Sequence, residues 1–133
     1  MLVNKTFLLK AVISSLLLTS AVAANASVTI DNRTTKPSTT IVNGGGCSKS
    51  IPFYGVTEPG AVNTIPDYLM NLSCRMNKEA CSAVIYMSRD CSGNPVATLT
   101  LNTVTNTIKS APQDTSSVAV EVDGTTVLLK ETK

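Results

Sequence analysis

Residues 118–129 read VAVEVDGTTVLL, and this stretch decides the fold. Valine occupies every second position of Val118–Val122, and the same period of two returns at Val127 and Leu129. A period of two is typical of β-strands that bury one face. Between the two runs, Asp123-Gly124 is a standard signal for a two-residue hairpin turn. The sequence therefore predicts a C-terminal β-hairpin that turns at Asp123-Gly124.

Short runs of β-forming residues, separated by turn formers, fill the chain before this hairpin. They are Val28–Ile30, Thr39–Val42, Ile51–Val56, Val62–Ile65, Ser82–Ser88, Val96–Leu101 and the Thr- and Asn-rich stretch Asn102–Ser110. Glu58-Pro59-Gly60 is a turn signal that would join Ile51–Val56 and Val62–Ile65 as a second hairpin. Tyr68–Cys74 reads as a further strand, with one helical turn as the alternative. No window has the period of an amphipathic helix.

Seven or eight short strands at spacings of about 8–12 residues are typical of a β-sandwich or a small barrel. We predict an all-β fold, a small disulfide-stapled β-sandwich. Residues 27–133 would form a single domain, because neither a repeat nor a linker divides them. This length is that of one ordinary domain.

Residues 1–26 have the pattern of a cleaved secretory signal peptide. Lys5 and Lys10 precede the apolar stretch Ala11–Ala24, and Ala24-Asn25-Ala26 supplies the small residues that signal peptidase accepts. The apolar stretch would rise only about 21 Å as a helix, short of the roughly 30 Å of a hydrocarbon core. We therefore expect a secreted or periplasmic, bacterial protein that has no integral membrane span in the mature chain. The expected start is Ser27, with cleavage after Ala23 as the alternative.

All four cysteines lie after this segment, at Cys47, Cys74, Cys81 and Cys91. An even number in a small exported chain indicates two disulfides, and the gaps of 27, 7 and 10 residues do not suit a zinc site. A strand over Ser82–Ser88 would carry the chain about 23 Å from Cys81, which excludes the pair Cys81–Cys91. Pairing Cys74 with Cys91 would need a nearly fully extended link. The favoured pairs are Cys74–Cys81 and Cys47–Cys91.

Composition excludes several kinds of function. The chain has no histidine, so a Ser-His-Asp triad, a Cys-His dyad and a histidine-ligated metal are excluded. Lys5 and Lys10 account for the formal charge of +2. The mature chain would be neutral, which argues against nucleic acid as a partner because phosphate binding needs excess Lys and Arg. We expect no cofactor and no metal site.

Phe53 and Tyr54 are the most suggestive candidates for a binding site. They lie beside Pro52 and follow the Gly-rich loop Gly44–Gly46. Neighbouring strand residues point to opposite faces, so one aromatic ring could be exposed and anchor a partner protein or stack on a sugar. The favoured alternative is that both rings help to fill a core that has few aromatic residues.

These observations predict an exported, non-enzymatic binding module whose target is an envelope component, a host protein or a glycan outside the cytoplasm. One alternative is an inhibitor of a secreted enzyme, which would insert Gly44–Tyr54 or Arg75–Ala80 into its partner's cleft. A less favoured alternative is a small hydrolase that uses carboxylates such as Glu58, Asp67 and Asp90.

Overall fold

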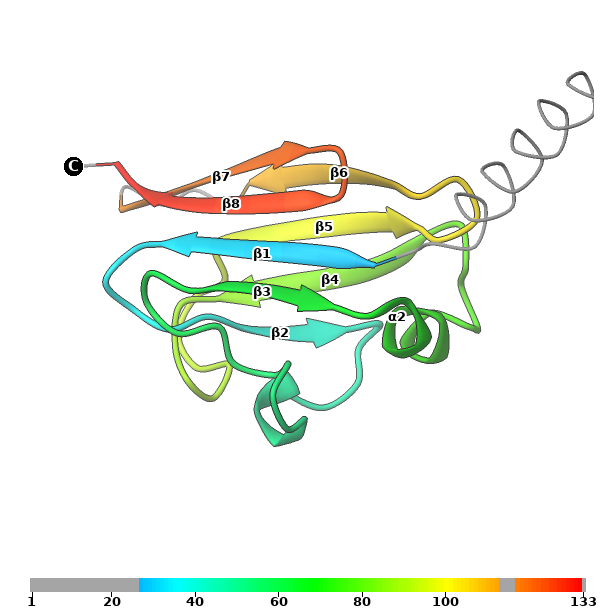
Figure 1. The fold of residues 1–133 in the computed structure, drawn as a ribbon, viewed down its shortest axis with the longest axis horizontal. Helices are drawn as coiled ribbons and strands as arrows, with labels where there is room; N and C mark the ends of the chain where they lie inside the picture. The colour runs from blue at the N-terminus through cyan, green and yellow to red at the C-terminus, as the bar shows by residue number, and fades with distance from the viewer. Residues whose placement is uncertain (1–26, 113–116, 133) are drawn as a thin grey trace, which may run out of the picture.

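The computed structural model describes residues 27–112 and 117–132, which form two four-stranded β-sheets (Figure 1). The strands are β1 (Val28–Arg33), β2 (Thr39–Val42), β3 (Val62–Ile65), β4 (Cys81–Tyr86), β5 (Ala97–Asn102), β6 (Thr107–Pro112), β7 (Val118–Asp123) and β8 (Thr126–Glu131). The described residues also contain the short helix α2 (Asp67–Ser73) and the 3-10 turn η1 (Ser48–Ser50). The predicted all-β fold class is confirmed.

The strands of each sheet are not consecutive along the chain. The first sheet has the order β3-β1-β8-β7 and the second has the order β2-β4-β5-β6. Strand β1 pairs in parallel with β8, whereas the other pairs are antiparallel. The parallel pair joins the first strand to the last and places the beginning of the described chain in the middle of a sheet.

The core lies between the inward faces of the two sheets. In β5, Leu99 and Leu101 are buried while Thr100 is exposed, as the alternation of this segment predicted. In β8, Val127 and Leu129 are completely buried. Buried residues recur at every second position of β1, β4, β5 and β8, and the apolar ones among them supply the contacts that hold the sheets together.

The two sides of the sandwich differ. On one side, the edge strands β6 and β7 are neighbours (Figure 1). On the other side the edge strands are β2 and β3, and residues 47–57, here named the capping loop, lie against both. The loop forms backbone bridges from Cys47 to Ile41 and from Thr57 to Ser38 at the β2 side. Helix α2 follows β3 directly and closes one end of this side (Figure 1).

The predicted hairpin of Ile51–Val56 with Val62–Ile65 is wrong. Only Val62–Ile65 is a strand, and it pairs with β1. Residues 51–55 form turns, and Phe53 has a φ of +70° that a strand does not allow. Gly60 does adopt the positive φ that the predicted turn at Glu58-Pro59-Gly60 requires, at +78°. The chain uses this turn to direct β3 to β1 instead of back along the capping loop.

Two smaller predictions also need correction. The stretch Tyr68–Cys74, expected as a strand, is helical because Pro66 precedes a run that buries Met70 against the core. The C-terminal hairpin exists, but Asp123 pairs with Thr126. Its two-residue loop is therefore Gly124-Thr125, one residue later than predicted, with Gly124 at a φ of +64°. Glycine at the first loop position suits a type II′ turn.

The predicted signal peptide, residues 1–26, lies outside the described residues. Among the residues that the structure describes, no helix has the length and apolar character needed to cross a membrane.

Candidate binding site

Two disulfides hold the irregular segments, and they are the two pairs that the sequence favoured. Cys47–Cys91, with Cα atoms 5.9 Å apart, joins the start of the capping loop to the turn between β4 and β5. Cys74–Cys81, at 5.4 Å, joins the end of α2 to the start of β4. Both links fix elements on the side of the sandwich that β2 and β3 border.

The capping loop is folded around the Ser48 hydroxyl. Ser48 Oγ accepts a hydrogen bond from the backbone N–H of Thr40 at 3.0 Å and donates one to the carbonyl of Gly55. A Cβ atom at Gly55 would lie 1.8 Å from the Ser48 carbonyl oxygen, so only glycine fits this close approach. One side chain therefore connects β2 to both halves of the loop.

The far end of the loop is held by two buried or half-buried asparagines. Asn32, whose side chain is completely buried, donates to the Thr57 carbonyl at 3.0 Å and to the Lys36 carbonyl at 2.8 Å. Asn63 of β3 donates to the Tyr54 carbonyl at 3.2 Å. The Thr57 carbonyl also accepts from the Ser38 N–H at 3.0 Å, so Asn32 adds a second hydrogen bond there. Together the two amide groups connect the loop to β1 and β3.

Phe53 and Tyr54 differ in exposure, although they lie in a turn and not in a strand. The Phe53 side chain is 91% exposed, while Tyr54 is half-buried beneath the loop. The favoured expectation that both rings fill the core is therefore wrong for Phe53. A partner-binding role for the two residues stays a prediction.

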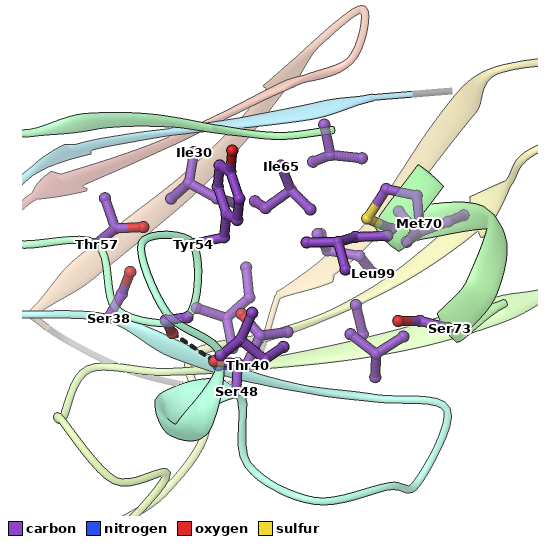
Figure 2. Close-up of a pocket in the computed structure, with 18 residues that line it drawn as sticks. Ile30, Ser38, Thr40, Ser48, Tyr54, Thr57, Ile65, Met70, Ser73 and Leu99 are labelled. Carbon is purple, nitrogen blue, oxygen red and sulfur yellow. Dashed lines mark hydrogen bonds between the residues drawn. The ribbon is translucent and has the colours of Figure 1, made fainter. Parts of the chain in front are cut away.

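Beneath Tyr54 lies a cavity of about 70 Å³ between the two sheets. Figure 2 shows Tyr54 between Ile30 and Ile65 on one side of the cavity, and Met70 and Leu99 on the other side. Protein interiors contain few spaces larger than a water molecule, so this cavity is a notable feature of the core.

Additional apolar side chains are exposed on the elements next to the capping loop. Val62 of β3 and Tyr68 and Leu72 of α2 are all well exposed. Tyr68 and Leu72 are four residues apart and share one face of the helix. This side of the molecule therefore presents several apolar groups to solvent, of which Phe53 is the most exposed.

Two of the carboxylates considered for catalysis, Glu58 and Asp90, have pKa values below their ordinary values. Arg89 donates two hydrogen bonds to Glu58, at 2.7 and 2.8 Å, and this interaction lowers the pKa of Glu58. The hydroxyl of Ser92 donates to Asp90 at 2.7 Å and lowers the pKa of Asp90. Asp67 begins α2. A general acid needs the opposite shift, toward a raised pKa.

Four residues that build this site were not identified from the sequence: Asn32, Ser48, Gly55 and Asn63. The turn-forming run that follows Asn32 was a usable signal, since asparagine commonly bonds backbone groups two to four residues away. The role of Gly55 depends on a contact within a loop whose conformation the sequence pattern did not predict.

The fold and its two cross-links define a small disulfide-braced β-sandwich with one capped side. The sequence profile of a family described as "T2SS substrate NttC" matches residues 4–131, and the chain belongs to this NttC family of type II secretion system substrates. Membership supports the prediction that the protein is exported. No curated protein matches the chain.

A solved structure supports the same fold. The crystal structure of the Legionella pneumophila type II secretion system substrate NttC is 21% identical to this chain, with a TM-score of 0.62. The match covers 80% of this chain and 97% of the Legionella chain. At this identity the likeness concerns the fold alone.

Proposed function

We propose that this protein is a non-enzymatic binding module, released from the cell by a type II secretion system, that binds a protein or glycan target through Phe53. The observation that carries the proposal is the 91% exposure of this ring on a loop that a disulfide and four side-chain hydrogen bonds hold in place. A large exposed aromatic residue on a rigid loop loses little conformational entropy on binding.

The backbone at Phe53 adds to this argument. Its φ of +70° is uncommon for a residue other than glycine and costs of order 1 kcal/mol or more. The loop thus keeps an unfavourable conformation that directs the ring into solvent. The lowered pKa values of Glu58 and Asp90 argue against a general-acid role for these two residues.

The export route is tested by locating the protein in cells that lack a functional type II secretion system. We expect the wild-type strain to release a chain that begins at Ser27 and is lighter by the four hydrogens of two disulfides. The deficient strain should retain the same species in the periplasm. Equal release from both strains would contradict this route.

The binding role is tested with Phe53→Ser against a glycan array and against purified envelope proteins. A matched control is Val104→Ser, which removes another well-exposed apolar side chain in the turn between β5 and β6. For each target that wild type binds, Phe53→Ser should weaken the affinity at least about 30-fold, the loss typical of a central aromatic anchor. The proposal fails if Phe53→Ser binds every target as wild type does, or if a bound target is chemically converted.

A second candidate function is inhibition of a secreted protease by the loop Arg75–Ala80. All six residues of this loop are exposed, and the Cys74–Cys81 disulfide closes it. A tight 1:1 complex with a trypsin-like protease, lost in Arg75→Ala and kept in Lys78→Ala, would favour this function. Without such a complex the inhibitor function is excluded for that class of protease.

A further inference from the structure

The cavity behind the capping loop is a separate feature from the exposed face of the loop. Its walls come from both sheets, through Ile30 and Ile65 on one side and Ile85 and Leu99 on the other, and from Met70 of α2. None of the residues that line it carries a charge. An ion or a strongly polar ligand would lose its hydration there without compensation.

Most of the residues that line the cavity are apolar, and the Ser48 hydroxyl at its β2 end is already hydrogen-bonded. Ser48 Oγ accepts a hydrogen bond from the Thr40 N–H and donates its own hydrogen to the Gly55 carbonyl. This hydroxyl therefore has no hydrogen left to donate to a molecule in the cavity. A buried water molecule typically needs about three polar partners. The interior part of the cavity, between Ile85 and Leu99, therefore favours an apolar occupant over water.

The space is maintained by the way the loop is held above it. The hydrogen bonds of Ser48 and the close contact at Gly55 fix the height of the capping loop over β2. Asn63 fixes the Tyr54 backbone from the opposite sheet edge. Because these contacts prevent the loop from moving into the core, the surrounding structure cannot relax to fill the cavity.

We propose that this cavity binds the end of an unbranched alkyl chain, with the polar end of the ligand at the rim near Ser73. The cavity volume of about 70 Å³ restricts which ligands fit. A cavity of about 150 Å³ holds a benzene ring, so this one is too small for a ring but admits a slim chain of a few carbons. Figure 2 shows the Ser73 hydroxyl at the edge of the cavity, on the same side as Met70.

The proposal is tested by titrating methyl-labelled protein with 1-hexanol and following its NMR signals. We expect saturable shifts for Ile85 and Leu99, which line the cavity, and none for Val122 of β7, which does not. Cyclohexanol has the same number of carbons in a wider shape and should bind at least about tenfold more weakly. Absence of saturable shifts, or equal binding of the two alcohols, would overturn the proposal.

A variant that fills the cavity provides the second measurement. Ala83 is buried and lines the cavity, so Ala83→Leu should abolish hexanol binding. Ala80→Leu makes the same change at an exposed position outside the cavity and should leave binding unchanged. If Ala83→Leu does not fold, Ile65→Phe fills the same space from β3 with a smaller increase in volume. A folded, filled variant that binds hexanol as wild type does would refute the site.

This experiment needs no partner protein or glycan. Failure of the Phe53 proposal therefore leaves the hexanol result unchanged, and failure of hexanol binding leaves the role of Phe53 open to its own test.

Discussion

Gly55 is the residue on which the conformation of the capping loop depends. A Cβ atom there would lie 1.8 Å from the Ser48 carbonyl oxygen and 2.8 Å from the Ile51 carbonyl oxygen, and backbone atoms cannot move aside as a flexible side chain can. Gly55→Ala should therefore destabilise the protein by at least about 2 kcal/mol, measured by denaturant unfolding. Gly46→Ala is the matched control, because a Cβ atom at Gly46 meets nothing within 4 Å.

The control should stay within about 0.5 kcal/mol of wild type. If both alanine variants are equally stable, the loop is not built around the contact at Gly55, and the rigid presentation of Phe53 loses its basis.

At this scale the sequence allowed Phe53 and Tyr54 to differ in exposure, but for the wrong structural reason. It placed Phe53 and Tyr54 on opposite faces of an extended segment, and the two side chains do differ in exposure. The cause is instead a turn in which Phe53 has a positive φ. Such a turn depends on Ser48 and Gly55 meeting in space, which no local pattern of residue types reveals.

Among the elements, α2 shows how tertiary contacts override local preference. A helix of seven residues is too short to be stable by itself, and too short to display the helical period. Met70, which is 6% exposed, is its one buried residue, and the disulfide at Cys74 fixes its end. The helix therefore exists because it covers one end of the core.

Met70→Ala should consequently cost about 2–5 kcal/mol of unfolding free energy, as is typical when a buried methionine is truncated. Leu72→Ala, two residues away on the same helix and exposed, should change stability by less than about 0.5 kcal/mol. Denaturant midpoints of the two variants provide the comparison. Equal effects would mean that α2 is held by its own helical propensity and not by the core.

Strand β3 shows the same limit for sheet pairing. Its residues were identified as a strand, but the partner assigned to them was the segment before the turn. Pairing with β1 places Ile65 opposite Val28, at the edge of the core, and this register depends on the position of β1 in three dimensions. Strand identity was thus accessible from local sequence, whereas the pairing of β3 was not.

For the whole molecule, the fold class followed from three local signals: the period of two, the spacing of turn formers and the even number of cysteines. The order of strands could not be obtained in the same way. The parallel pairing of β1 with β8 joins segments from opposite ends of the domain, and nothing in either segment specifies the other. The cavity likewise results from how the two sheets and the capping loop meet.

The two disulfides should contribute unequally to stability. Cys47–Cys91 closes a segment with a sequence separation of 44, and Cys74–Cys81 one with a separation of 7. On chain entropy alone, these closures are worth about 4 and about 2.5 kcal/mol. Replacing both members of each pair with alanine and measuring unfolding free energies tests this order. A larger loss for Cys74–Cys81 would show that the burial of these two residues in the core outweighs chain entropy.

Acid should destabilise the folded protein through three surface carboxylates. Arg89 lowers the pKa of Glu58, Ser92 lowers that of Asp90, and Thr35 lowers that of Glu131, each chiefly by hydrogen bonding to the carboxylate. The lowered values mean that the folded state favours the charged forms. Their stabilising contribution is therefore complete well above the ordinary values of 4.5 for Glu and 3.8 for Asp, and it is lost as the pH falls through the lowered values.

We accordingly expect the thermal midpoint to be steady above about pH 5 and to fall as the pH is lowered below the ordinary carboxylate range. Glu58→Gln should make this fall shallower because it removes one of the titrating groups. Arg89→Gln should also make it shallower, since Arg89 is the first cause of the lowered pKa of Glu58. The double variant should add nothing further if the two residues act only through each other. An unchanged acid profile in Glu58→Gln would show that the hydrogen-bonded pair, exposed on the surface, does not contribute to acid stability.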